Sequence, residues 1–256
     1  MGNTDRVHGF GTESYGESFA DIYDDWYGDI SDTEGTVAFL SKLIGDRRLL
    51  ELGIGTGRLA LPLAAAGFAV SGLDASGPMI DLLRAKPGGD AIDVAIGDMA
   101  DIGEAAPPPG ATFGVALIAF NTFFNLTSED AQQRCLDGVA QRLEPGGRLV
   151  IEAYVPGDDP RSGEAMTVRS MEVDRVVLSI SRRDPASQTA TGQYIELTDA
   201  GVRLRPWMIR YAAPPELDRM AERAGLRLVE RWAGWRGEPY SDSSTHHVSV
   251  YGAPDA

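Results

Sequence analysis

Three glycines alternate with other residues directly after a short apolar run that ends in an acid. The glycines are Gly53, Gly55 and Gly57, and the acid is Glu51, within LLELGIGTGRLALPLA at positions 49–64. Glycine at this density lets a ligand approach the backbone closely. The turn would join a strand to a helix, and N–H groups at the start of a helix favour an anion or a carboxylate. We therefore expect a ligand to rest on this turn, as nucleotides do in doubly wound folds.

Two further acids follow strand-like segments. Asp74 ends FAVSGLD, 17 residues after Gly57, and Asp98 follows IDVAIG in the phrase GDM. Ligands of open α/β sheets bind at the carboxyl ends of the strands, so these acids are expected near the glycine turn. A dinucleotide site has the spacing G-x-G-x-x-G, whereas this chain has G-x-G-x-G. The spacing therefore disfavours a nicotinamide-dependent oxidoreductase.

This ordered series resembles the class I S-adenosylmethionine-dependent methyltransferases. The similar features are E-x-G-x-G-x-G, the acid ending the second strand, the acid after the third and LEPGG before the fifth, between about Leu49 and Tyr154. The resemblance implies S-adenosylmethionine as cofactor and S-adenosylhomocysteine as product. It also implies that Gly53 and Gly55 let the backbone pass under the methionine part. Asp74 would accept hydrogen bonds from both ribose hydroxyls, since a carboxylate has two acceptor oxygens.

The same resemblance assigns further cofactor contacts. Met79 would pack on the adenine, and Asp98 with the N–H of Met99 would bind the polar edge of that ring. Phe120 would lie beside the transferable methyl and offer its carbonyl to the methionine ammonium. For Met79 and Glu51, a purely structural role is an equal alternative. The expected cofactor-binding residues are Tyr15, Glu51, Gly53, Gly55, Gly57, Asp74, Ala75, Met79, Asp98, Met99 and Phe120.

Aromatic residues near the N-terminus form a second candidate site. In YGESFADIYDDWY, residues 15–27, they recur at helical intervals. Flat aromatic faces hold a cation such as a sulfonium. The segment resembles the lid helix of small-molecule N-methyltransferases of antibiotic pathways, of the aminosugar and lincosamide types. In that comparison Tyr15 would reach the cofactor carboxylate, while Tyr23 and Phe123 would border the reacting centre.

Acceptor binding is expected at the carboxyl ends of the fourth and fifth strands. FNTFF follows the fourth strand, and Glu152 and Tyr154 end the fifth, where either could hold an ammonium or a hydroxyl. For each aromatic residue, packing in the core is the alternative. We predict catalytic roles for Tyr15, Tyr23 and Phe123, and acceptor contacts from Tyr23, Tyr27, Phe123, Phe124, Glu152, Tyr154 and His247.

A general base is hard to find in this sequence. His8 lies in the polar N-terminal tail, and His246 and His247 begin the last strand, where alternation points them to opposite faces. One of the two could face the pocket, but a surface position is expected. A neutral amine needs no base, whereas a phenol or alcohol usually does. The scarcity of histidines therefore favours an amine acceptor, with an O-methyltransferase and a non-catalytic cofactor-binding scaffold as alternatives. The sequence contains no cluster of Cys and His residues, so a catalytic metal is not indicated.

The order of the elements predicts how these residues are positioned. Strand-like and helix-like segments alternate up to Pro156, which predicts an α/β, Rossmann-like, doubly wound fold with a mostly parallel seven-stranded sheet. Four strand-like segments then follow without a helix and predict an antiparallel cap. The expected units are an N-terminal helical lid over 1–45, a cofactor-binding core over 46–156 and 212–256, and a substrate cap over 157–211.

Composition limits the possible partners. The chain has 256 residues, with 23 basic and 38 acidic side chains and a net charge of −15. Nucleic acid and an anionic membrane are disfavoured, because binding phosphate needs clustered Lys and Arg. The single Cys135 forms no internal disulfide, and we find neither a membrane span nor a signal peptide. We expect a cytoplasmic enzyme with a small-molecule acceptor, and a homo-oligomer and a monomer are both compatible with the sequence.

Overall fold

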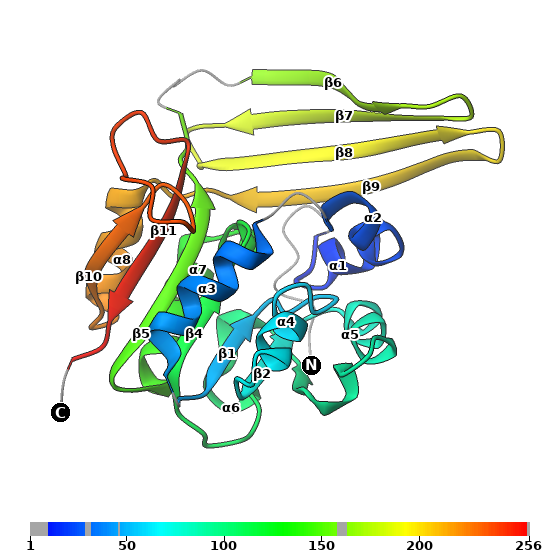
Figure 1. Ribbon diagram of the computed structural model, residues 1–256. Helices are drawn as coiled ribbons and strands as arrows, with labels where there is room; N and C mark the ends of the chain where they lie inside the picture. The colour runs from blue at the N-terminus through cyan, green and yellow to red at the C-terminus, as the bar shows by residue number, and fades with distance from the viewer. Residues whose placement is uncertain (1–9, 29–31, 46, 158–162, 255–256) are drawn as a thin grey trace.

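The computed structural model describes residues 10–28, 32–45, 47–157 and 163–254 (Figure 1). It contains a seven-stranded sheet with the order β10-β11-β5-β4-β1-β2-β3. Strands β1 to β5 pair in parallel, and β11 runs antiparallel to both β5 and β10. The predicted α/β fold with a mostly parallel seven-stranded sheet is confirmed. The strands are β1 (Leu49–Leu52), β2 (Val70–Asp74), β3 (Asp93–Ile96), β4 (Phe113–Ile118), β5 (Leu143–Tyr154), β10 (Arg227–Trp232) and β11 (His246–Gly252).

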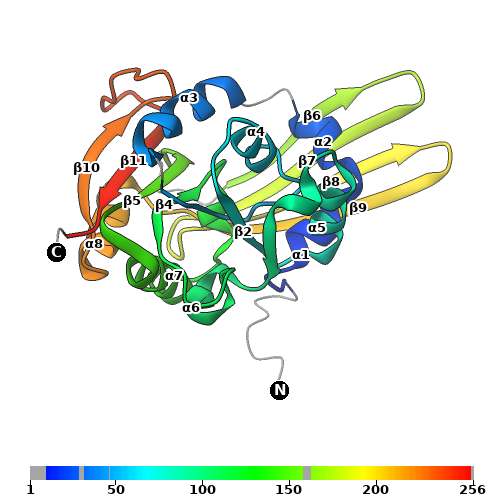
Figure 2. The ribbon, with the colours of Figure 1, turned by 60° about the horizontal axis from the view of Figure 1, so that its bottom comes forward.

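Helices cover both faces of this sheet (Figure 2). One core cluster joins the strands to α6, α7 and α8, and a second joins them to α3, α4 and α5. Strands β1 and β4 are therefore buried along their whole length, as strands of a parallel sheet covered on both faces are. The helices are α3 (Thr33–Ile44), α4 (Ala60–Ala65), α5 (Gly77–Ala85), α6 (Ile102–Ala105), α7 (Glu129–Arg142) and α8 (Pro214–Arg223).

Side-chain caps set where several helices begin. Asp32 accepts a hydrogen bond from the N–H of Gly35 at the start of α3, and Ser76 accepts one from Met79 at the start of α5. Asp32 is therefore the N-terminal cap of α3. Strand β5 begins at residue 143, earlier than predicted, so LEPGG belongs to the strand.

The aromatic N-terminal segment folds as three short helical pieces rather than one continuous helix. They are α1 (Ser14–Phe19), η1 (Ala20–Ile22) and α2 (Tyr23–Tyr27), which we call the lid. The lid lies beside α5 and along β9 (Figure 1). Phe19, Ile22 and Met79 form a small separate core there, so the predicted aromatic stripe holds the lid to the rest of the fold.

The four inserted strands form a separate antiparallel sheet, as predicted. They are β6 (Gly163–Met171), β7 (Arg175–Asp184), β8 (Thr189–Thr198) and β9 (Gly201–Arg210), and we call them the cap sheet. Its two hairpins project beyond the seven-stranded sheet (Figure 2). The division of the chain into three functional units stays a prediction. No helix in the described part of the chain is long and apolar enough to cross a membrane.

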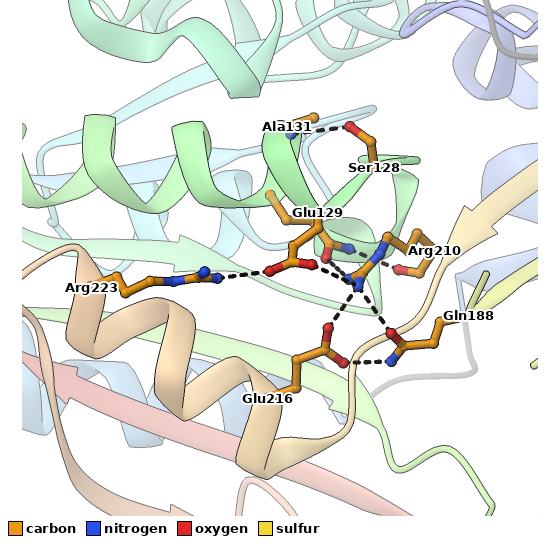
Figure 3. A network of polar contacts seen from close by, with 8 residues as sticks. Ser128, Glu129, Ala131, Gln188, Arg210, Glu216 and Arg223 are labelled. Carbon is orange, nitrogen blue, oxygen red and sulfur yellow. Dashed lines mark hydrogen bonds and ion pairs between the residues drawn. The ribbon is translucent and has the colours of Figure 1, made fainter. Parts of the chain in front are cut away.

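A polar network fixes the end of β9 to the helices (Figure 3). The buried Arg210 donates to Gln132 of α7 at 2.6 Å and to Glu216 of α8 at 2.6 Å. It also donates to Gln188, the residue directly before β8, at 3.1 Å. Because a buried guanidinium is costly without partners, this network holds the cap sheet at one place on the core.

Candidate active site

A cavity of about 650 Å³, counted to its open mouth, lies at the carboxyl ends of β1 to β4. This position is where open α/β sheets bind ligands. The lid closes one side of it. The lining residues are Thr12, Tyr15, Gly16, Tyr23, Gly53, Gly55, Asp74, Ala75, Met79, Gly97, Asp98, Met99, Thr122, Asn125 and Leu126.

The glycine turn owes its shape to backbone angles that favour glycine. Gly53, Gly55 and Gly57 have φ values of +71°, +54° and +80°. A Cβ on Gly53 would lie 2.3 Å from the Thr122 side chain. The turn can therefore approach the loop after β4 only because residue 53 has no side chain. Gly57 does not line the cavity, and a Cβ there would press on Leu83 of α5 at 3.0 Å. It therefore serves helix packing.

The acids after β2 and β3 bind backbone N–H groups beside the cavity. Asp74 accepts from Gly55 at 2.8 Å through Oδ2 and from Ser76 at 2.8 Å through Oδ1. Burial raises the pKa of this carboxyl above its ordinary value. Each carboxylate oxygen has a second acceptor site, so the predicted contact with ribose hydroxyls fits this geometry. Asp98 accepts from Ala100 at 2.8 Å in the same way.

Glu51 is a buried acid with an unpaired oxygen. Its Oε2 has no hydrogen-bond partner among the described residues, and burial raises the pKa of its carboxyl to about 8. A buried unsatisfied polar atom in a native fold calls for an explanation such as a missing ligand. A cationic group on the glycine turn would supply one, so the residues present fit a cofactor that carries an ammonium and a sulfonium.

The lid packs closely on the cavity wall. A Cβ on Gly16 would lie 2.3 Å from Cβ of Ser76, so α1 rests directly on the start of α5. Tyr15 stacks on Phe19 with ring centroids 4.5 Å apart. Burial raises the pKa of both Tyr15 and Tyr23 above 10. These two hydroxyls therefore stay protonated at neutral pH and act as hydrogen-bonding groups.

Arg205 of the cap sheet ties the lid in place. Its guanidinium donates to both carboxylate oxygens of Asp21, at 2.6 and 3.0 Å, and to the carbonyl of Ser18 at 2.6 Å. Glu196 of β8 accepts a further bond at 3.0 Å. Such a bidentate pair fixes orientation as well as distance. The cap sheet therefore holds the lid over the cavity.

A β-bulge adds a second arginine to the same face. The pairing of β6 with β7 shifts register between Val168 and Ser170, which turns Arg169 toward the lid. Its guanidinium lies 4.5 Å from the ring of Trp26, 5.3 Å from Tyr27 and 5.2 Å from Tyr194. Cations in such positions are attracted by the ring faces.

Several predicted acceptor contacts lie in the core instead. Phe123 and Phe124 are fully buried in the cluster that includes α7 and α8, because the turn after β4 points both rings inward. Glu152 accepts from the N–H of Phe120 at 2.8 Å and from the Trp235 indole at 2.8 Å, so both of its oxygens have structural partners. None of these residues lines the cavity.

Tyr154 and His247 also have neighbours away from the cavity. Tyr154 packs against Phe124, and burial raises the pKa of its hydroxyl to about 12. His247 is fully buried, which corrects the expected surface position, because it faces α8 while His246 faces solvent. Its Nδ1 lies 2.8 Å from Oγ of Ser249, and burial lowers its pKa to about 4.

Other predicted residues do come together. The ring of Tyr27 lies 4.9 Å from Tyr23 and 5.6 Å from Phe120. Sequence reasoning missed Arg58, whose guanidinium lies 5.1 Å from the Phe120 ring, although it follows the last glycine of the turn directly. It also missed the loop residues Thr122, Asn125 and Leu126. The sequence did contain one indication of this loop. Asparagine adopts positive φ more readily than most residues, and in the structure both Asn121 and the preceding Phe120 have positive φ. In the described chain, no group of three or more His, Cys, Asp or Glu residues is placed to hold a metal.

Comparisons with known proteins agree with this geometry. A family model described as "Methyltransferase domain" matches residues 49–147. The structure of the CcbJ methyltransferase from Streptomyces caelestis is similar with a TM-score of 0.87 and 38% identity, covering 96% of this chain and 100% of that one. A cypemycin N-terminal methyltransferase from a Streptomyces species is 29% identical over 240 residues, covering 92% of this chain and 96% of that protein.

A more distant structure shares the fold. The sugar N-methyltransferase KedS8 from a Streptoalloteichus species has a TM-score of 0.68 at 19% identity, covering 100% of this chain and 98% of that one.

Proposed function

This chain belongs to the S-adenosylmethionine-dependent methyltransferases, and we propose that its acceptor is an amine nitrogen of a small specialised metabolite. When bound, S-adenosylmethionine supplies an electrophilic methyl group, which the lone pair of an acceptor takes while S-adenosylhomocysteine leaves. The proposal concerns the acceptor and the residues that bind it.

The protonation states around the cavity carry this proposal. Burial raises the pKa of Tyr15 and Tyr23, so neither hydroxyl is a base at neutral pH. His247, buried against Ser249, is not among the lining residues. A neutral amine already holds the lone pair that forms the new bond, whereas a hydroxyl acceptor needs its proton removed. The site therefore suits nitrogen better than oxygen.

The residues of this chain would act by alignment and by exclusion of water. In the proposed complex the glycine turn and Glu51 hold the methionine end, and Asp74 holds the ribose. Tyr23 and Tyr27 would then border the reacting atoms; their rings are tilted against each other, and Tyr27 packs edge to face with Phe120. In this complex the lid would cover the cavity and exclude water, so that the rate of methyl transfer depends on how the donor and the acceptor are positioned.

The names of similar proteins support a nitrogen acceptor. The cypemycin enzyme, by its name, acts at an N-terminus. A direct competition between acceptors tests the point. We would incubate the protein and S-adenosylmethionine with matched small molecules that differ only in carrying an amine or a hydroxyl.

We expect methylation of the amine, with a rate that rises with pH as the amine loses its proton. Methylation of the hydroxyl partner instead would overturn the proposal in favour of an O-methyltransferase. Calorimetric titration with S-adenosylhomocysteine is the control. A protein that binds the product but methylates no member of a broad amine panel would support the scaffold alternative.

A further inference from the structure

Two consecutive residues at the start of the loop after β4 have backbone angles that side chains rarely adopt. Phe120 has a φ of +52° and Asn121 a φ of +63°. Asparagine takes this left-handed conformation several times more often than most residues, whereas a bulky phenylalanine seldom does. Residues in such strained conformations persist only where the surrounding structure holds them, and they gather at functional sites. We therefore looked for the contacts that hold this pair and for what the pair positions.

The loop that begins with this pair forms one wall of the cavity. Its residues that line the cavity are Thr122, Asn125 and Leu126. The Thr122 side chain fills the place that a Cβ on Gly53 would take, so the loop lies directly against the glycine turn. The ring of Phe120 contacts the lid through Tyr27, with centroids 5.6 Å apart. The backbone at 120 and 121 therefore sets where this wall meets both the glycine turn and the lid.

Hydrogen bonds from the end of β5 hold both residues. The carboxylate of Glu152 accepts from the Phe120 N–H through Oε2 at 2.8 Å, and the Glu152 backbone carbonyl accepts from the Asn121 N–H at 3.0 Å. The Asn121 side chain accepts from the Tyr154 N–H at 2.7 Å. A residue of any type at 152 could supply the carbonyl. The bond to Phe120, however, requires an acceptor on the side chain.

Trp235 binds the other oxygen of the same carboxylate. Its indole N–H donates to Oε1 of Glu152 at 2.8 Å. Trp235 is 7% exposed, and its ring packs edge to face against Phe39 of α3 with centroids 5.5 Å apart. Because the indole is held by this packing, it fixes the direction in which the carboxylate points. Hydrogen bonds to a carboxylate are also stronger than those to a neutral acceptor.

We propose that Glu152, oriented by Trp235, is a positioning residue for methyl transfer. It holds Phe120 and Asn121 in the left-handed conformation and thereby fixes the cavity wall beside the transferred methyl. The inference deepens the proposed function and rests on its placement of the reacting atoms near Phe120. Glu152 is not among the residues that line the cavity, so it acts through Phe120. A displacement is sensitive to small misplacements of the reacting atoms, which is why such a distant residue affects the rate.

Glu152→Gln tests this role while keeping the length of the side chain. An amide has one oxygen and one NH2 group, so it can accept from the Phe120 N–H or from the Trp235 indole but not from both. Hydrogen exchange at the backbone amides of residues 120–126, followed by mass spectrometry of the protein without ligand, should be about tenfold faster than in the unmodified chain. The value of kcat should fall about tenfold.

Affinity for the cofactor separates positioning from binding. Calorimetric titration of Glu152→Gln with S-adenosylhomocysteine should give an affinity within about threefold of the unmodified value, because Asp74 and Asp98 are unchanged. Glu144→Gln is the control, since Glu144 lies at the opposite end of β5. It should leave exchange, kcat and affinity unchanged.

Three results for Glu152→Gln would overturn the inference. They are unchanged exchange at 120–126, unchanged kcat, and an affinity that falls as far as kcat does, because Glu152 would then serve donor binding. Exchange is measured without an acceptor. The rate is measured with whichever acceptor, amine or hydroxyl, the competition experiment identifies. Methylation of the hydroxyl would therefore refute the amine proposal and leave this test intact.

A second substitution should reverse the effect of the first. Trp235→Phe keeps a ring in the same place but removes the indole N–H, so the NH2 group introduced by Glu152→Gln no longer faces a donor. The double variant should therefore recover exchange protection and kcat to within about threefold of Trp235→Phe alone. Losses that add in the double variant would show that the two residues act independently, and would overturn the inference.

A pair of substitutions at Asn121 tests the backbone conformation itself, also where Glu152→Gln fails to fold. Asn121→Gly and Asn121→Ala both remove the bond to the Tyr154 N–H, but glycine takes positive φ freely and alanine does not. Asn121→Ala should therefore have a kcat lower by about threefold or more than Asn121→Gly, and faster exchange at 120–126. Equal rates would show that methyl transfer does not need the left-handed conformation, and would refute the inference.

Discussion

The Asp74 carboxylate and the Gly55 backbone are joined by a hydrogen bond of 2.8 Å from the Gly55 N–H to Oδ2. The other oxygen accepts from Ser76 at 2.8 Å. Asp74, at the end of β2, therefore both fixes the glycine turn after β1 and lines the cavity. Loss of this side chain should affect both the turn and the ligand.

Asp74→Ala is expected to weaken cofactor binding by roughly 1.5–3 kcal/mol, since charge-assisted hydrogen bonds to the ribose would be lost. Asp74→Asn should lose less, because its amide oxygen can still accept one of the two backbone bonds. Calorimetric titration with S-adenosylhomocysteine measures the affinity, and thermal unfolding reports on the turn. Unchanged affinity in a folded Asp74→Ala protein would mean that the ribose assignment is wrong.

Glu51 should make cofactor binding depend on pH. Its pKa is raised to about 8, so the free protein carries this carboxyl protonated at pH 7. A bound ammonium favours the ionised form, and binding must therefore release a proton below that pKa. The affinity should rise with pH up to about 8, by at most about tenfold per pH unit.

Calorimetry in two buffers of different ionisation enthalpy measures this proton release directly. Glu51→Gln provides the comparison, because the amino group of the cofactor titrates equally in both proteins. The difference between them isolates Glu51. Identical proton release from the two proteins would show that the Oε2 atom of Glu51 does not respond to the ligand.

Arg205 and Arg203 contact the same lid residue from different environments. Arg205 is 2% exposed, whereas Arg203 is 54% exposed and lies 2.7 Å from Asp21. Arg205→Ala should lower the free energy of unfolding by roughly 2 kcal/mol, because it removes the hydrogen bonds of a buried guanidinium to Asp21, Glu196 and the Ser18 carbonyl. Arg203→Ala should change it by about 0.5 kcal/mol or less. Urea unfolding gives both values.

The same pair of variants tests the lid. Arg205→Ala should raise KM for the methyl donor, because the hydrogen bonds from Arg205 fix Asp21 and hold the lid over the cavity. Arg203→Ala should leave KM near the unmodified value. Equal effects of the two substitutions would argue against a special role for the buried arginine.

His247 should contribute a loss of stability in acid. Its pKa is about 4 in the folded chain and 6.5 ordinarily, because burial disfavours the charged form. Between those pH values the unfolded chain binds a proton that the folded chain does not, so stability falls as pH falls from 6.5 to 4. The full loss is roughly 3 kcal/mol. His247→Asn should show a shallower fall in urea unfolding midpoints over this range, and an unchanged slope would contradict the assignment.

The order of the elements and most of the residues that line the cavity could be predicted from local sequence patterns. Each strand-like or helix-like segment can be recognised from its own residues, and so can a glycine or an acid at the end of a strand. Gly53, Asp74 and Asp98 could therefore be predicted. The cap sheet was equally readable from four runs of strand-like residues with turns between them. Because these patterns lie within short stretches of sequence, they can be recognised without knowledge of the fold.

The acceptor side was harder because it depends on distant pairs. Arg205 and Asp21 are 184 residues apart, and no local pattern announces their contact. The rings of Phe123 and Phe124 could have pointed to either side of a short turn, and packing with α7 and α8 decided it. From the sequence, Glu152 is an acid at the end of a strand and was predicted to bind the acceptor. In the structure its carboxylate accepts a hydrogen bond from Trp235, which is distant in the sequence.

The position of the lid has a kinetic consequence. Tyr15, Gly16 and Tyr23 of the lid line the cavity, and we expect the hydrogen bonds from Arg205 to Asp21 to break when the lid moves aside to release the spent cofactor. The lid also carries the residues proposed to hold the acceptor, so donor exchange would free the acceptor too. We therefore expect an amine that takes two methyl groups to be modified distributively, with the monomethylated product accumulating in solution before the second turnover.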